Sequence, residues 1–349
     1  MLDDMNSYDR KAWDAVVEWR TRRLTTQQRH LFPKSARDRV AKAGAKVQER
    51  AGQLPGAEAL QETLSKAVDG VIGTVNRAAI ASVRQKAVLG AYAKRGHELD
   101  DLADIATLDL QMIDKVKPRL DLRYTVASGA EGAGAGLAVS GGEIIATGSS
   151  VASAGAAAAP SAMAILGIMA ADAVAVLVAA TRAVGHTAAY YGYDTELADE
   201  RLYALGVLNF GLASQAGKSA AYVELNKIVQ ALARNATWQQ LDKNAVTRVV
   251  KMVYSAMGEK ITKEKLGQAL PVVGILIGAG LNMRTLASIT SDADHLYRER
   301  FLREKYRLTG QFISVPEPDP TSADTIEVSE LITNAITTGE TEPGPAIDQ

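Results

Sequence analysis

Apolar residues recur every three or four positions along most of the chain, which is the spacing of one face of an α-helix. Residues 8–25 are typical, because Trp13, Val16 and Leu24 are separated by charged residues. No stretch shows the alternation of apolar and polar residues that is typical of a strand. The pattern therefore predicts an all-α protein. The further helices that it predicts cover residues 34–54, 57–93, 97–117, 161–184, 194–212, 214–233, 238–257 and 271–306.

Two segments are unusually rich in glycine and alanine. In the first, Gly132 and Gly136 have the spacing at which helices pack closely through small residues. In the second, Gly274 and Gly278 repeat that spacing at the start of the last predicted helix. Such helices either form the tightly packed centre of a single large bundle or contact a bilayer or a partner. The sequence leaves both alternatives open.

The apolar helix that follows the first of these segments raises the question of whether the protein spans a membrane. Its window of about 20 residues, 161–181, is long enough to span a bilayer. Asp172 stands near the middle of that window, and a carboxylate there opposes stable insertion. We therefore expect peripheral or reversible membrane association rather than a transmembrane helix.

The net charge of −1 hides an uneven distribution. Residues 311–349 contain eight acidic residues, five of the ten prolines, and no lysine or arginine. This composition predicts a disordered acidic tail over residues 310–349, after a single helical domain over residues 1–309. The tail is a candidate for docking onto a partner. The rest of the chain carries +7. That charge favours an anionic membrane surface or a membrane protein complex as a partner, contacted by the basic helices near the N-terminus.

Several classes of function are excluded or disfavoured by what the sequence lacks. The chain contains no cysteine, which excludes disulfides, cysteine-ligated metals and cysteine nucleophiles. It has no phosphate-binding loop, no GxSxG motif and no HExxH motif. We therefore predict no catalytic residues, no bound metal and no cofactor. No nucleic-acid partner is expected either, because no motif combines aromatic and basic residues. Without a secretory leader, the expected location is the cytoplasm, peripheral at the inner face of the membrane.

Four segments are distinctive in their order along the chain. They are the Leu54-Pro55-Gly56 turn, the glycine-rich run 131–136, the helix from Asp172 into Tyr191-Gly192-Tyr193-Asp194 with Asp199-Glu200-Arg201 behind it, and the run from Pro271 through Gly274, Gly278 and Asn282 to a helix ending near Arg300. Together they span roughly residues 8–308 and resemble the EcsC family. A longer Gly/Ala/Ser insertion over residues 140–159 departs from the pattern of that family.

The resemblance implies a bacterial, mostly helical protein. The EcsC family has no established activity and therefore supplies no catalytic residues. Its name-giving member is encoded beside an ABC transporter, and that context implies association with a membrane.

Six polar residues are the strongest candidates for ligand binding: Asp172, His186, Tyr190, Asp194, Asn282 and His295. A carboxylate in an apolar helix, such as Asp172, is costly unless it is paired or bound. His186 and Tyr190 lie four residues apart and share a helix face, and Asp292 and His295 form a similar pair three residues apart. The alternative is structural. Asp172 would then form a buried ion pair, and the others would cap a helix or join a hydrogen-bond network.

The leading functional hypothesis is a non-enzymatic, cytosol-facing protein that associates peripherally with a membrane or a membrane complex. One alternative is a helical module that binds an apolar ligand or lipid near Asp172 and His186, or docks on a larger assembly through its acidic tail. Another alternative is a metal-dependent enzyme, with Glu131, Asp172, Asp194 and His295 as ligands.

Overall fold

The computed structural model describes residues 4–25, 83, 85–124, 162–215, 217–234, 253, 257 and 274–308, with the backbone alone for 162–174, 231–234 and 274–283. Every regular element within these residues is helical, which confirms the all-α prediction. The elements are α1 (Ser7–Thr25), α4 (Gln85–Ala93), the 3₁₀ helix η2 (Ala103–Thr107), α5 (Leu110–Val116), α8 (Ala162–Tyr190), α9 (Ala198–Leu212), α10 (Lys218–Arg234) and α12 (Gly274–Lys305).

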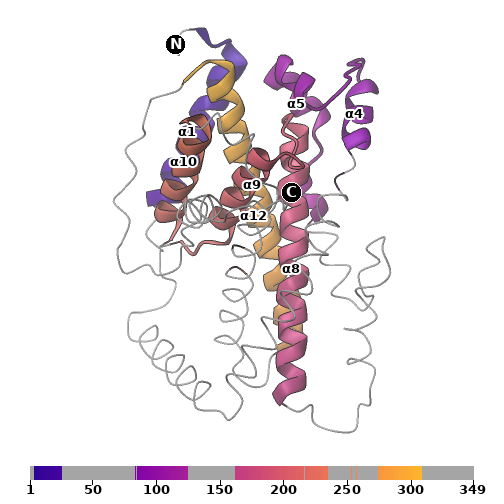
Figure 1. The fold of residues 1–349 in the computed structure, drawn as a ribbon, viewed down its shortest axis with the longest axis vertical. Coiled ribbons are helices and arrows are strands. Elements are labelled where there is room, and N and C mark those ends of the chain that lie inside the picture. Colours follow the sequence, from indigo (N-terminus) through magenta and orange to yellow (C-terminus); the bar gives the residue numbers. More distant parts are fainter. Residues whose placement is uncertain are drawn as a thin grey trace, which may run out of the picture.

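The two longest described helices, α8 and α12, lie against each other and run in the same direction, so both begin at the lower end of the molecule in Figure 1. Helix α9 packs against both of them and against α10. Helix α1 runs antiparallel to α12, because Lys305 pairs with Asp9 whereas Asp292 pairs with Arg23. The described helices thus form a multi-helix bundle.

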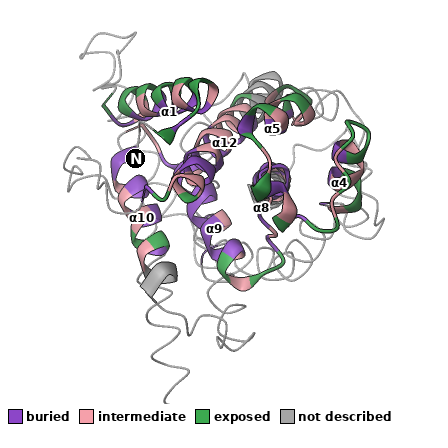
Figure 2. Cartoon of the chain, turned by 90° about the horizontal axis from the view of Figure 1, so that it is seen from above, coloured by how far each residue is buried: buried purple, intermediate pink, exposed green. Residues whose placement is uncertain are grey.

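Helix α9 is the most enclosed described helix, and it is purple along most of its length in Figure 2. Its sequence is apolar on nearly all faces, as expected for a helix surrounded by others. Its buried residues run almost without a break from Leu202 to Gly211. At Gly211, an added Cβ would lie 3.1 Å from the side chain of Ile289, so the glycine lets α9 and α12 approach closely.

The end of α8 is set by Gly192. This residue has a φ of +90°, which is a left-handed conformation that glycine adopts without strain. The Tyr193 amide reaches back to the Ala188 carbonyl at 3.0 Å and closes the helix end. The helix that we predicted to begin at Asp194 begins instead at Ala198. The Asp194 carboxylate accepts a hydrogen bond from the Glu196 amide at 2.9 Å and so fixes a turn ahead of α9.

The prediction of one helix over residues 97–117 was wrong. The structure has the short η2 and α5 there, separated by an extended Leu108 and Asp109. The apolar spacing is helical, but two aspartates satisfy backbone amides locally. Asp104 accepts hydrogen bonds from the amides of residues 100 and 101, and Asp101 accepts one from the Ala103 amide at 2.7 Å. These bonds compete with a continuous helix.

Several predictions fall outside the described residues. They concern Glu131, Gly132 and Gly136 and the tail over residues 310–349, together with the predicted helices over residues 34–54, most of 57–93 and nearly all of 238–257. The prediction that the Gly/Ala-rich segments form the centre of the bundle also lies outside the described part, since the structure describes only the backbone of residues 162–174 and 274–283. Among the described residues, no helix is both long and apolar enough to cross a bilayer.

Candidate functional site

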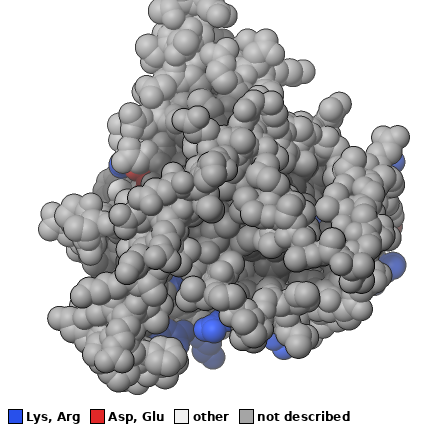
Figure 3. Space-filling model, turned by 90° about the horizontal axis from the view of Figure 1, so that it is seen from below, with Lys and Arg blue, Asp and Glu red and all other residues white. Residues whose placement is uncertain are grey.

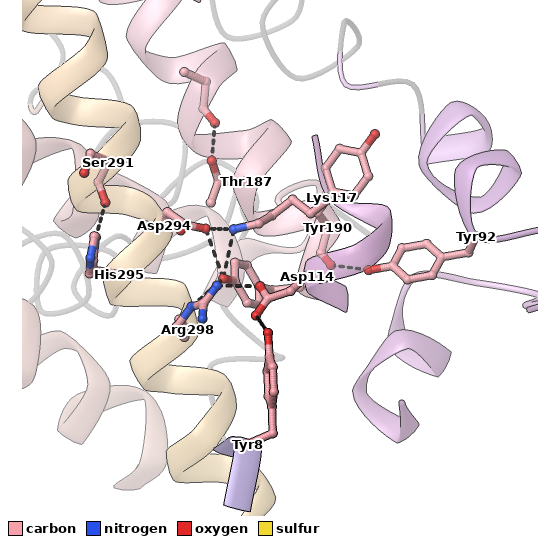
Figure 4. A network of polar contacts seen from close by, with 12 residues as sticks. Tyr8, Tyr92, Asp114, Lys117, Thr187, Tyr190, Ser291, Asp294, His295 and Arg298 are labelled. Carbon is pink, nitrogen blue, oxygen red and sulfur yellow. Dashed lines mark hydrogen bonds and ion pairs between the residues drawn. The ribbon is translucent and has the colours of Figure 1, made fainter. Parts of the chain in front are cut away.

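A network of polar side chains lies where the C-terminal end of α8 packs against α12 (Figure 4). At its centre, the amine of Lys117 contacts the carboxylate of Asp294 and donates to the hydroxyl of Tyr191 at 3.1 Å. The Tyr191 hydroxyl in turn donates to Asp294 at 3.0 Å. Lys117 directly follows α5, so these three groups tie the end of α5 and the end of α8 to α12.

The network continues through a second ion pair. Arg298, one turn beyond Asp294 on α12, contacts the carboxylate of Asp114 and donates to the Tyr191 hydroxyl at 3.2 Å. Asp114 also accepts a hydrogen bond from the Tyr8 hydroxyl at 2.7 Å, which adds the start of α1 to the network. Three separate segments are therefore anchored on one face of α12.

The protonation of these groups follows from their burial. Desolvation, and then the like charge of Arg298, lower the pKa of Lys117 to about 7, against the opposing effect of Asp114. The contact with Asp294 also favours the ammonium form. Desolvation raises the pKa of Tyr191, which therefore keeps its proton and acts as a donor. The direct structural effect of the network is to fix helix ends on α12.

His186 lies in a second chain of hydrogen bonds, on α8. Its Nδ1 is 3.0 Å from the Tyr124 hydroxyl, and Arg182 hydrogen-bonds the same tyrosine. Burial, and then the positive charges of Arg182 and Arg123, together lower the pKa of His186 to about 4. The imidazole is therefore neutral at pH 7. The Tyr124 pKa is raised to about 12 by burial, so its hydroxyl donates to Nδ1.

The buried position of His186 predicts that part of the stability of the protein is lost in acid because of this one residue. Between pH 6.5 and 4, the unfolded state binds a proton at His186 and the folded state does not. The free energy of unfolding therefore falls as the pH is lowered through this range. Allowing for partial solvent screening, we expect His186 to lower the free energy of unfolding by about 2 kcal/mol when the pH is lowered from 7.5 to 4.5. His186→Asn keeps an acceptor for Tyr124 and removes the titration.

Urea unfolding of both proteins at pH 7.5 and pH 4.5 measures this effect. The variant should be less stable than the wild type at pH 7.5, and that deficit should shrink by about 2 kcal/mol at pH 4.5. A deficit that stays constant across the two pH values would contradict a neutral, buried His186.

The predicted pair of Asp292 and His295 does not converge on one ligand. Asp292 is 2% exposed and accepts from Arg23 at 2.7 Å and from Lys218 at 2.9 Å. His295 instead hydrogen-bonds the Ser291 carbonyl at 2.7 Å and stacks on Trp19, with ring centroids 4.5 Å apart. Within the described ranges, no three His, Asp or Glu side chains lie close enough to hold a metal ion.

The other candidate residues have separate roles. His186 and Tyr190 share a face of α8 as expected, with ring centroids 6.1 Å apart, and the Tyr190 carbonyl accepts from the Tyr92 hydroxyl. Asp194 lies beyond the helix end, where it accepts from Gln85 at 2.9 Å. Asp172 and Asn282 lie within α8 and α12, as do Gly274 and Gly278 in α12, but the side chains at these positions are outside the described part.

Sequence reasoning missed the residues at the centre of the network. Asp294 and Arg298 are four residues apart, and Asp114 and Lys117 are three apart, so each pair shares a helix face or its continuation. This spacing of opposite charges is a possible signal of a polar network, but it is also common on solvent-exposed helix faces and so does not identify one. Nothing in the sequence indicates that the two pairs meet.

Residues 20–302 match the EcsC protein family. The chain belongs to the EcsC family. The match includes α4, α5, α8, α9 and α10, most of α12 and the end of α1, and it therefore contains every member of the Lys117 network except Tyr8.

Two proteins from Bacillus subtilis (strain 168) are similar to the chain. Protein YdbA is 25% identical over 256 residues, which cover 72% of this chain and 82% of YdbA. Protein EcsC is 28% identical over 114 residues, which cover 33% of this chain and 43% of EcsC. No solved structure matches the chain.

Proposed function

We propose that this EcsC-family protein is a non-enzymatic protein that associates peripherally with the cytosolic face of a membrane, or with a membrane complex there. The observation that carries the proposal is the common starting point of α8 and α12 at one end of the molecule (Figure 1). Both of the Gly/Ala-rich apolar runs that begin these helices, residues 162–171 and 274–281, are thereby brought to that end.

The physical basis is the mixture of apolar helix starts and positive charge. An apolar helix end can enter the headgroup region to a depth of about 5–10 Å without spanning the bilayer. In the view from that end, lysine and arginine side chains are visible at parts of the rim (Figure 3). Near an anionic surface, each such cation contributes about 1 kcal/mol of attraction.

The contribution of α1 differs from the one expected from sequence. We expected the early basic residues to face headgroups. Arg20 is 3% exposed and pairs with Glu299 at 2.6 Å, and Arg23 pairs with Asp292 at 2.7 Å. Both guanidinium groups therefore form ion pairs with carboxylates of α12. Membrane attraction has to come from other cations.

Co-sedimentation with vesicles tests the proposal. The full-length protein should sediment with vesicles of phosphatidylglycerol and phosphatidylcholine at low salt, and much less with phosphatidylcholine alone. Because screening weakens electrostatic attraction, about 0.5 M salt should release most of it. If the protein stays in the supernatant with both kinds of vesicle, peripheral membrane binding is refuted.

Matched variants locate the contact. Ile277→Asp places a charge in the apolar start of α12 and should reduce binding about tenfold or more, since a charge in an apolar membrane segment costs about 2.5–3.5 kcal/mol. Leu197→Asp is the control, because Leu197 is 55% exposed and follows the opposite end of α8. Circular dichroism should show that both variants keep their helices. Equal loss in both would place the contact elsewhere.

A further inference from the structure

A cleft opens beside the C-terminal end of α1, where that helix meets α12 and the start of α10. Its volume is about 310 Å³, at the lower end of the range for pockets that hold small molecules. The cleft is separate from the Lys117 network. Its lining residues are Trp19, Arg22, Arg23, Gln215, Ser288, Ser291 and Asp292.

The charge of this lining is positive. It contains two guanidinium groups and a single carboxylate. That carboxylate, on Asp292, is already shared between Arg23 and the buried amine of Lys218. The Nε atom of Arg23 is buried and has no hydrogen-bond partner among the described residues. Arg22 pairs with Glu18 at 4.0 Å, but both side chains are more than 70% exposed, so water screens that pair. Guanidinium groups bind oxyanions with two parallel hydrogen bonds, so an anion would offset the positive charge that Arg23 and Lys218 carry beyond that of Asp292, as well as the unmet donor.

Neutral donors complete the site. The hydroxyl oxygen of Ser288 accepts a hydrogen bond from Arg23 at 2.7 Å, which leaves its proton available for another acceptor. Ser291 lies one turn away on α12 and also lines the cleft. Gln215 donates to the Arg23 carbonyl at 2.6 Å and so fixes the end of α1 beside the cleft. Trp19 is held in place by its stack with His295.

The position of the cleft indicates the source of the anion. Ser288 lies 14 residues after Gly274, or about 21 Å along α12 at 1.5 Å per residue. That distance exceeds the 5–10 Å that an interfacial helix enters a membrane. A lipid phosphate at the end where α12 begins would therefore not reach the cleft. We propose that the cleft between α1 and α12 binds a small water-soluble oxyanion, a phosphate monoester or a carboxylate.

Titration of the full-length protein with inorganic phosphate and with acetate tests this proposal, with chloride at matched ionic strength as the reference. Trp19 lines the site, so tryptophan fluorescence should change in a saturable way, and calorimetry should give the same affinity. Arg22→Gln should weaken phosphate or acetate binding about tenfold, since a charged bidentate contact is worth roughly 1.4 kcal/mol or more. The stronger of the two probes identifies the oxyanion class.

Arg10→Gln is the matched control, because it removes the same charge from the same helix far from the cleft, and it should bind like the wild type. Ser288→Ala combined with Ser291→Ala should weaken binding while leaving the net charge unchanged. An equal response to chloride, or unchanged phosphate and acetate binding by Arg22→Gln, would overturn the proposal. The titration contains no lipid, so its outcome is independent of the vesicle experiment.

Discussion

Glu299→Ala should lower the free energy of unfolding by about 3–5 kcal/mol, the typical cost of leaving one member of a buried ion pair without its partner. Glu299 lies on α12, and its Oε1 accepts from Arg20 of α1 at 2.6 Å and from Tyr222 of α10 at 2.8 Å. The side chains of Arg20 and Glu299 are only 4% and 5% exposed. Without the carboxylate, the Arg20 charge would remain buried and uncompensated.

Urea unfolding followed by circular dichroism measures this loss. Asp14→Asn is the control, because Asp14 is 64% exposed and its pair with Arg10, at 3.4 Å, is screened by water. That variant should leave the unfolding midpoint unchanged. Similar midpoints for Glu299→Ala and Asp14→Asn would mean that Arg20 finds water or another partner in the folded protein.

Gly192→Ala should lower the free energy of unfolding by about 3 kcal/mol. Part of this cost is the positive φ of +90°, which an L-residue with a Cβ tolerates poorly, at about 1–2 kcal/mol. The rest is steric, because the new Cβ would lie 2.8 Å from the carbonyl oxygen of Leu102. That oxygen belongs to the backbone ahead of η2, so relieving the contact has to move a whole segment.

Gly90→Ala provides the comparison for Gly192→Ala. Gly90 lies inside α4, and an added Cβ there has no neighbour within 4 Å among the atoms of the structure. Alanine favours a helix over glycine by about 1 kcal/mol, so this variant should be slightly more stable than the wild type. Two variants with the same chemical change should thus shift the unfolding midpoint in opposite directions. A shift of Gly192→Ala in the stabilising direction would refute the strained contact.

The presence and position of a helix could be predicted from the sequence wherever the helical spacing of apolar residues continued without interruption over a long stretch. Residues 271–306 and 161–184 are examples, since α12 and α8 cover most of both ranges. The prediction failed over residues 97–117, because short aspartate side chains compete for backbone amides and apolar spacing does not register that competition. Local spacing also placed His186 and Tyr190 on one face correctly.

The candidate site could be predicted only in part, because its members come from distant parts of the chain. Lys117 and Asp294 are 177 positions apart, and Tyr8 and Asp114 are 106 apart. The spacing of residues within a helix gives no information about which helices become neighbours. For the same reason, the sequence did not indicate that Arg20 and Arg23 have their acidic partners on the last described helix.

The pairing of α1 with α12 has a consequence for synthesis of the protein in the cell. Arg20 and its partner Glu299 are separated by 279 positions. At a translation rate of about 5–20 residues per second, Glu299 is made roughly 14–56 s after Arg20. During that interval, the buried face of α1, including Trp13, Val16 and Trp19, has no α12 to cover it. The apolar face of α1 therefore stays uncovered by α12 until that helix leaves the ribosome, and exposed apolar surface of this kind is prone to aggregation in a nascent chain.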